Sequence, residues 1–192
     1  LKNLIFKIKS KKKINCEVAA GSAHYSKYYG STFKEIEKDK IKINYSVKKN
    51  FDNLSHENII DYISKTLPEF KKIIKKSLPD LVVVLGDRFE IFSAVSSAMI
   101  AKIPVAHLHG GETTEGAFDE AIRHCITKMS HLHFTATETY RQRVIQLGEE
   151  PERVFNVGAP GIDSIHRLDL LERKALEEKI GLELGSRSLL VT

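Results

Sequence analysis

Short apolar runs alternate along the chain with segments whose apolar residues recur every three or four positions. The short runs predict strands, and the longer periodic segments predict helices. The run from Leu81 to Leu85 contains no polar residue, which is typical of a strand at the buried centre of a parallel sheet. Strands are expected at residues 14–20, 40–47, 81–85, 105–109, 133–135 and 154–157, and helices at 1–8, 31–39, 55–76, 90–101, 119–129, 138–147 and 168–180.

This alternation predicts an α/β fold with a doubly wound, Rossmann-like parallel sheet. Residues 40–47 alternate apolar and polar side chains, so this strand is expected near a sheet edge. Ser31 is a candidate N-cap, and Pro68 is expected to kink or divide the helix at 55–76. Residues 22–29 are expected to form a loop or a short helix.

The same pattern predicts the domain organisation. Residues 1–167 are expected to form the Rossmann-like domain, residues 168–187 a charged connecting helix, and residues 188–192 the first strand of a second domain. The chain opens inside a helical pattern at Leu1 and stops inside an apolar run at Thr192. We therefore expect both ends to have been cut from a longer protein.

The charge of the chain limits the classes of partner that it is expected to bind. The 192 residues carry a formal net charge of +5, with lysine-rich stretches at 11–13 and 71–76. Because these stretches lie at segment ends or on polar helix faces, we interpret them as solvated surface and expect no nucleic-acid partner. Mild positive charge also suits a small anionic substrate.

Cysteine usage and hydropathy indicate the compartment. Cys16 falls in an expected strand and Cys125 in an expected helix, and neither belongs to a Cys-x-x-Cys pattern. Structural thiols in a reducing compartment are therefore expected. The chain shows no signal-peptide pattern and no apolar run that approaches a membrane span, so a cytoplasmic location without a membrane partner is expected.

Charged clusters follow two neighbouring strands and open the next helix. The first is Gly86-Asp87-Arg88, where glycine permits a tight turn and Arg88 at a helix N-terminus suits a phosphate or carboxylate. Taken alone, Asp87 could be an ordinary helix cap. The carboxyl ends of parallel strands lie side by side and line the ligand crevice, so we expect the clusters to meet in one active site.

The second cluster runs from His107 to Glu112. Strand alternation predicts that His107 and His109 point to the same face, and Gly110-Gly111 lets a ligand approach the backbone and places Glu112 over the crevice. Two histidines and a carboxylate could also hold a divalent ion. No metal is expected, because the histidines lie on an extended strand rather than in a known ligand motif.

The third cluster, Asp119-Glu120 and Arg123-His124, opens a helix. Acidic residues stabilise a first helical turn, and Asp119 and Arg123 have the spacing of a surface ion pair. In the functional interpretation, Asp119 projects into the crevice opposite Glu112. Two carboxylates in different environments are what proton abstraction and proton return require.

Several motifs carry a family resemblance. They are LGDRFE at 85–90, IPVAHLHGGE at 103–112, DEAIRH at 119–124 and TKMSHLH at 127–133, with further matches at 21–24, 29–32, 143–149 and 154–158. In these motifs and their order the chain resembles the hydrolysing UDP-N-acetylglucosamine 2-epimerases of sialic-acid and legionaminic-acid pathways. The resemblance covers nearly the whole chain.

The resemblance implies the N-terminal half of a two-domain fold of the glycosyltransferase-B type. It implies that the family's first strand and the substrate-holding loop after it are missing here, as is the C-terminal nucleotide-binding domain. Relatives are commonly dimers or tetramers, so a homodimer or homotetramer is expected.

It also implies the reaction, in which UDP-GlcNAc and water give N-acetylmannosamine and UDP through a 2-acetamidoglucal, with no redox cofactor. By resemblance, the acid/base residues are Asp87, Glu112 and Asp119, and Arg88 assists the phosphate. The substrate-binding or orienting residues would be His24, His107, His109, Gly111, Arg123, His124, His131 and His133.

Two assignments stay open at this point. Some relatives carry a catalytic glutamate where this chain has His109, so either Glu112 reaches the same point or His109 has taken over its role. Asp119 and Glu120 compete for the third acidic position, and we choose Glu112 and Asp119. The alternative functions are the same chemistry on UDP-N,N′-diacetylbacillosamine or GDP-GlcNAc, and a nucleotide-sugar-binding, glycosyltransferase-like module without epimerase chemistry.

Overall fold

The computed structural model describes residues 1–49, 55–165 and 168–188. The chain divides into two units, residues 1–160 and 161–192, which are described separately here. In the first unit the helices are α1 (Lys2–Lys9), α2 (Phe33–Lys38), α3 (His56–Ser77), α4 (Phe89–Ile100), α5 (Asp119–Lys128) and α6 (Glu138–Gln146), with short 3₁₀ helices at Ser22–Tyr25 and Pro151–Arg153. The strands are β1 (Ala19–Ala20), β2 (Tyr45–Ser46), β3 (Val82–Leu85), β4 (Val105–Leu108), β5 (Leu132–Thr135) and β6 (Val154–Asn156).

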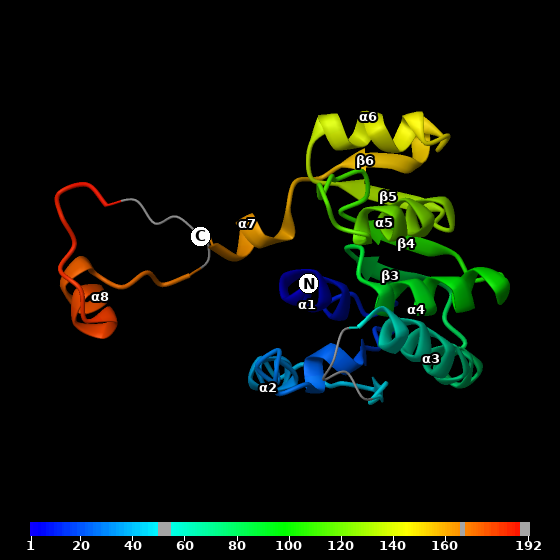
Figure 1. Cartoon of the computed structure of the whole chain (residues 1–192), viewed down its shortest axis with the longest axis horizontal. Coiled ribbons are helices and arrows are strands. Elements are labelled where there is room, and N and C mark those ends of the chain that lie inside the picture. Colours follow the sequence, from blue (N-terminus) through cyan, green and yellow to red (C-terminus); the bar gives the residue numbers. More distant parts are fainter. Residues whose placement is uncertain (50–54, 166–167, 189–192) are drawn as a thin grey trace. The chain divides into compact units, whose positions relative to one another are not determined.

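Four strands form a parallel sheet in the order β3-β4-β5-β6, and they lie side by side in this order in Figure 1. This confirms the predicted parallel α/β fold. The prediction that the run at 81–85 is a central strand is wrong for the sheet that the described residues form, because β3 lies at its edge. Leu81 and Val83 are accordingly 42% and 38% exposed.

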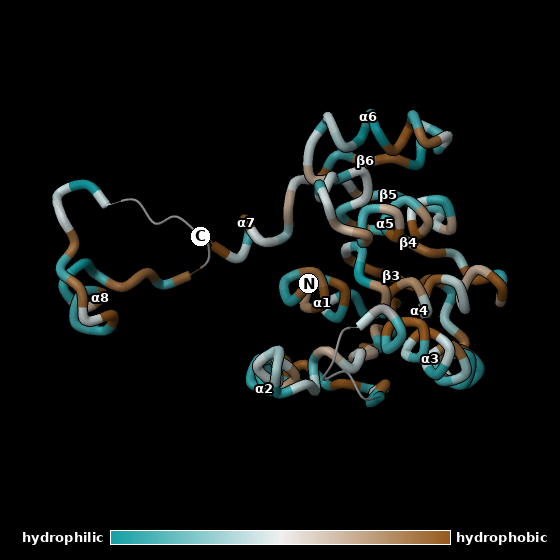
Figure 2. Tube along the Cα trace, in the orientation of Figure 1, coloured by the Kyte–Doolittle hydropathy of each residue, from teal (hydrophilic) through white to brown (hydrophobic). Residues whose placement is uncertain are grey.

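The hydrophobic core lies between the sheet and the helices that follow its strands. Val84 and Val105 from the strands pack with Val95 and Ala98 of α4 and Ile126 of α5. Every residue of β4 is buried, and Figure 2 shows the apolar character of this strand. The packing fixes the start of α4 and α5 near the carboxyl ends of β3 and β4, where the charged clusters lie.

The first two strands are much shorter than predicted. They pair with each other in a separate two-stranded parallel sheet, through Ala19 with Tyr45 and Ala20 with Ser46. Ile14 is 53% exposed and Cys16 lies before the strand, so apolar character there reflects loop positions rather than a paired strand. The predicted N-cap Ser31 is also wrong, because its φ is 51° and Thr32 precedes α2.

Helix α3 continues through Pro68 as one helix of 22 residues, so the predicted division into two helices is wrong. Pro68 and Ser64 both lie on the exposed side of the helix. Because proline removes the hydrogen bond to the carbonyl four residues earlier, water can solvate the Ser64 carbonyl in its place. Ser55 caps the helix, accepting a bond from the Asn58 N–H.

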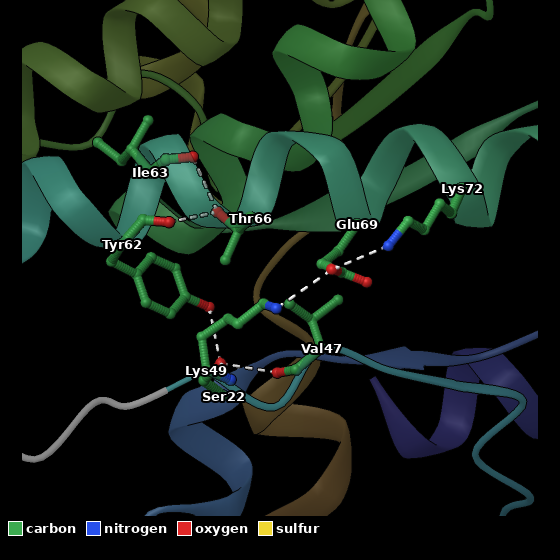
Figure 3. Close-up of polar contacts among 8 residues, drawn as sticks. All are labelled: Ser22, Val47, Lys49, Tyr62, Ile63, Thr66, Glu69 and Lys72. Carbon is green, nitrogen blue, oxygen red and sulfur yellow. Dashed lines mark hydrogen bonds and ion pairs between the residues drawn. The ribbon is translucent and has the colours of Figure 1, made fainter.

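A buried hydroxyl joins α3 to the N-terminal sheet (Figure 3). Ser22 Oγ donates to the Val47 carbonyl at 2.7 Å and accepts from the Lys49 N–H at 2.9 Å and the Tyr62 hydroxyl at 3.1 Å. Glu69, farther along α3, accepts from the ammonium groups of Lys49 and Lys72 at 3.1 and 3.2 Å. These bonds hold the segment after β1 beside α3.

A second buried connection passes through His107, which is fully buried in β4. His107 Nε2 lies 2.8 Å from the Gly86 carbonyl, and Nδ1 lies 3.3 Å from Thr127 Oγ1 on α5. The carbonyl can only accept, so Nε2 carries the proton and the threonine hydroxyl donates to Nδ1. Burial lowers the pKa of His107 to about 4. The histidine therefore joins the end of β3 to α5 as a neutral ring.

The same-face prediction for His107 and His109 does not hold, because strand β4 ends at Leu108. His109 has a φ of 65°, so strand alternation no longer applies to its side chain. Two residues later, Gly111 has a φ of 79° and packs against α6. A Cβ there would lie 2.9 Å from Val144 Cγ2 and closer still to the Tyr140 carbonyl oxygen.

The second unit contains α8 (Arg173–Ile180) and most of α7 (Pro160–Ile165), which was not predicted. Helix α8 falls inside the expected helix at 168–180, and Arg173 forms an ion pair with Glu177 at 3.0 Å. The predicted strand at 188–192 lies almost wholly outside the described residues. Among the described helices, none has both the length and the apolar character that a membrane span would need.

The glycines at 111 and 116 provide a matched test of this packing. Both have positive φ, but the space around a Cβ on Gly116 is open. We predict that Gly116→Ala lowers the free energy of unfolding by about 1 kcal/mol from backbone strain. Gly111→Ala should cost at least about 2 kcal/mol more, because the clash with α6 adds an overpacking cost. Urea unfolding of the intact protein measures both, and equal losses would contradict the close packing.

His107 predicts a pH dependence of stability. The unfolded chain takes up a proton near pH 6.5, whereas the folded chain resists until about pH 4. Its contribution is therefore complete above pH 6.5 and is lost as the pH falls through this window, on the order of 3 kcal/mol in all. Urea unfolding between pH 7 and pH 4 should show a shallower decline for His107→Gln than for wild type. The exposed His131→Gln serves as the control, and an unchanged decline in His107→Gln would contradict the prediction.

Candidate active site

The central contact of the site joins Asp87, directly after β3, to Arg123 on α5. Arg123 is 5% exposed, and its Nη2 donates to both Asp87 Oδ2 and Thr114 Oγ1, the latter at 2.9 Å. A buried guanidinium requires a counter-charge, and Asp87 provides it. Arg123 thus pairs across the fold with Asp87, and not in the surface pair with Asp119 that the spacing alone would allow.

Asp119 lies beside this ion pair at the start of α5. Its Oδ1 is buried and has no hydrogen-bond partner among the described residues. Burial is the main cause that raises the pKa of Asp119, and the negative charge of Asp87 adds to it, while Arg88 and Arg123 oppose the shift. Two carboxylates therefore share one region, one bound to a guanidinium and the other in a setting that favours its protonated form.

Glu120 differs from the neighbouring Asp119 in that its carboxylate oxygens have partners. Its Oε2 accepts the Thr114 N–H at 3.1 Å, and its Oε1 lies 3.7 Å from His124 Nε2. The carboxylate thus holds the loop before α5. Because Glu120 has these partners while Asp119 keeps an unpaired buried oxygen, the geometry favours Asp119 as the acid/base residue.

Glu112 follows β4 and accepts a 2.5 Å hydrogen bond from His109 Nδ1. The Gly86 N–H donates to the Leu108 carbonyl at 3.0 Å, so the ends of β3 and β4 are adjacent. Thr114, two residues after Glu112, is bound by the same guanidinium as Asp87. These bonds bring the chain segments of Asp87, Glu112 and Asp119 to one end of the sheet.

A second group of side chains surrounds Arg88. Its Nε donates to both carboxylate oxygens of Glu90, at 3.1 and 3.3 Å, and its guanidinium lies 5.2 Å from the Tyr29 ring. His24 interacts with this pair. Burial is the main cause that lowers its pKa, while Glu90 raises it and Arg88 lowers it further. Sequence reasoning did not select Glu90 or Tyr29, although both lie within the motifs quoted above.

Several predicted site residues lie elsewhere. His131 Nδ1 accepts the N–H of Val105, the first residue of β4, at 3.3 Å, which places it at the amino ends of the strands. His133 Nε2 lies 3.0 Å from Glu149, which also pairs with Lys128 at the end of α5. His131 is therefore separated from the charged residues at the carboxyl ends, while His133, in register with His107 inside β5, has Glu149 as its side-chain partner. His107 and Gly111 hold the strand ends and the following loop in place.

The arrangement suits proton transfer beside an anionic substrate. Two carboxylates whose environments differ can act as base and acid in one reaction, and Arg88 provides a cationic group nearby. Within 1–49, 55–165 and 168–188, no set of three or more histidine, cysteine or acidic residues is arranged to hold a metal ion.

Comparisons with known proteins identify the family to which the chain belongs. A family model described as UDP-N-acetylglucosamine 2-epimerase matches residues 6–192. The chain is 39% identical over its full length to a GDP/UDP-N,N′-diacetylbacillosamine 2-epimerase (hydrolyzing) from Campylobacter jejuni, covering 50% of that protein. It is 41% identical over 94% of its length to the polysialic acid biosynthesis protein P7 of Escherichia coli, covering 46% of that protein.

The fold of the chain is also similar to that of solved structures. The crystal structure of UDP-GlcNAc 2-epimerase from Neisseria meningitidis, bound to UDP-GlcNAc, superposes with a TM-score of 0.79 at 22% identity. The match covers 93% of this chain and 48% of that one, and it confirms the predicted N-terminal fold of the glycosyltransferase-B type. The chain spans about half the length of the curated relatives that it matches. On the strength of the family match, the chain belongs to the UDP-N-acetylglucosamine 2-epimerase family.

Proposed function

We propose that this chain is the N-terminal half of a hydrolysing UDP-GlcNAc 2-epimerase, which converts UDP-GlcNAc and water into N-acetylmannosamine and UDP. The observation that carries the proposal is the pair of unlike carboxylates around Arg123. Asp87 is ion-paired, and Asp119 next to it has a raised pKa. The reaction needs one group that takes a proton and another that returns one.

The proposed reaction has two steps. A base removes the proton from sugar C2 while the C1–O bond to UDP breaks, which gives the 2-acetamidoglucal and UDP. Water then adds to C1, and a proton returns to C2 from the opposite face. Asp87, Glu112 and Asp119 supply the acid/base groups, and no redox cofactor is required.

The cationic and imidazole groups of the site have binding roles in this proposal. Arg88 meets the departing diphosphate, and His24, in the 3₁₀ helix Ser22–Tyr25, interacts electrostatically with Arg88. His109 orients Glu112 through its 2.5 Å hydrogen bond. Arg123 and His124 lie on the same helix as Asp119 and complete the set at this end of the sheet.

The names of the relatives favour a second candidate substrate. Proteins named for UDP-N,N′-diacetylbacillosamine are 39% and 34% identical to this chain. The chemistry at C1 and C2 would be the same, and the sugar would differ at C4 and C6. Release of UDP or GDP from UDP-GlcNAc, UDP-N,N′-diacetylbacillosamine and GDP-GlcNAc, measured in parallel, separates these substrates.

We propose that the complete enzyme also contains a first strand before α1 and a second, nucleotide-binding domain after residues 168–187. By this proposal the enzyme is a homodimer or homotetramer. Activity is therefore to be measured on the full-length protein.

The direct test is turnover of UDP-GlcNAc by the full-length protein in D2O, followed by NMR. We expect N-acetylmannosamine with deuterium at C2, because the C2 proton is lost and then replaced from solvent. Product without deuterium at C2 would contradict the proposed chemistry. UDP release that requires a sugar acceptor would indicate a glycosyltransferase instead.

The acid/base residues predict large losses of activity. Glu112→Gln and Asp119→Asn should each lower turnover at least about a hundredfold, as expected for groups that transfer protons. Glu115→Gln, at an exposed position in the same loop, serves as the control and should keep wild-type turnover. Near-normal activity in both variants would remove these residues from the mechanism.

A further inference from the structure

The loop between β4 and α5, residues 109–118, is held by side chains at each end of its acidic segment. At one end His109 bonds Glu112 at 2.5 Å. At the other, Thr114 is held through both its backbone and its side chain. Residues 113–116 are otherwise exposed to solvent, so burial does not fix their position.

Thr114 receives its two bonds from neighbouring positions on α5. Glu120 Oε2 accepts the Thr114 N–H at 3.1 Å, and Arg123 Nη2 donates to Thr114 Oγ1 at 2.9 Å. A hydrogen bond to a charged group contributes more to stability than one between neutral groups. Both of these bonds have a charged partner.

An acidic residue in the first turn of a helix often serves only to stabilise the helix dipole. Glu120 has a more specific geometry, because its two oxygens face the Thr114 N–H and His124 Nε2. The first contact reaches six residues back along the chain. It therefore fixes the loop relative to the helix that carries Asp119 and Arg123.

Arg123 extends this connection to the acid/base residues. The nitrogen that bonds Thr114 is the one that bonds Asp87. Residue 114 is only two positions from Glu112, a span of at most about 7 Å of extended chain. Movement of Thr114 would therefore displace Glu112 relative to the Asp87 ion pair.

We propose that Thr114 and Glu120 are positioning residues that hold Glu112 in place relative to Asp87 and Asp119. This inference rests on the proposed function, because Glu112 must act on the substrate for its position to matter. It assigns Glu120 the role of holding the loop, and leaves acid/base chemistry to Asp119.

The loop contact itself is tested without activity, by amide hydrogen exchange of the full-length protein. We expect Glu120→Ala to speed exchange of the Thr114 amide at least about tenfold, because the variant loses an acceptor worth about 1.5 kcal/mol or more. Glu120→Gln keeps an amide oxygen that can accept, and should restore much of the protection. Glu115→Ala, in the exposed part of the loop, should change nothing at Thr114. Unchanged exchange in Glu120→Ala would overturn the proposal.

The positioning role is tested with Thr114→Val, which removes the hydroxyl while conserving shape. We expect kcat to fall about tenfold with little change in KM, the result of losing one bond to a charged group. Thr114→Ser restores the hydroxyl and should restore kcat. In a Glu112→Gln background, Thr114→Val should have no further effect, because its influence passes through Glu112. An equal fold loss in both backgrounds would show a general structural role and overturn the proposal.

The two experiments separate the possible failures. If the wild-type protein turns over none of the nucleotide sugars, the proposed function fails and the positioning role fails with it, while hydrogen exchange still decides whether Glu120 holds the loop. If turnover is present and Glu112→Gln keeps only a reduced but measurable rate, an additive result for Thr114→Val overturns the positioning role alone.

Discussion

The buried ion pair between Arg123 and Asp87 is the constraint on which the candidate site depends. Arg123 is 5% exposed, so its guanidinium must be compensated by a negative charge, and Asp87 in the turn after β3 provides it. The pair therefore fixes the start of α5 against the end of β3. It also places Asp119, four residues earlier on α5, beside a second carboxylate, which produces the electrostatic difference that proton transfer requires.

The neutral ring of His107 stabilises the arrangement of Asp87 and Arg123 from inside the sheet. By joining the Gly86 carbonyl to Thr127, it fixes the turn that carries Asp87 to the same helix that carries Arg123. The sequence indicated that His107 is important, but strand alternation suggested that it faces the ligand. Its position in a strand buried on both faces makes it part of the support of the site.

Much of the fold and the site could be predicted from the sequence, because apolar runs and strand ends have strong local patterns. The charged clusters after β3 and β4 were correctly placed together for this reason. The partner of Arg123 could not be predicted, because both Asp119 and Asp87 offer a carboxylate and only tertiary packing selects between them. Likewise, His131 and His133 belong to a family motif, yet the direction of β5 puts His131 at the amino ends of the strands, and His133, in register with His107, bonds Glu149.

The most direct test of this account is a carbon-13 NMR titration of the Asp119 carboxyl group in the full-length protein. The account predicts a pKa above that of an ordinary aspartate. In Asp87→Asn, loss of the neighbouring negative charge should lower this pKa, although burial, the larger cause, remains. An ordinary pKa for Asp119 in the wild-type protein, or one that Asp87→Asn leaves unchanged, would contradict the claim that the two carboxylates meet around Arg123.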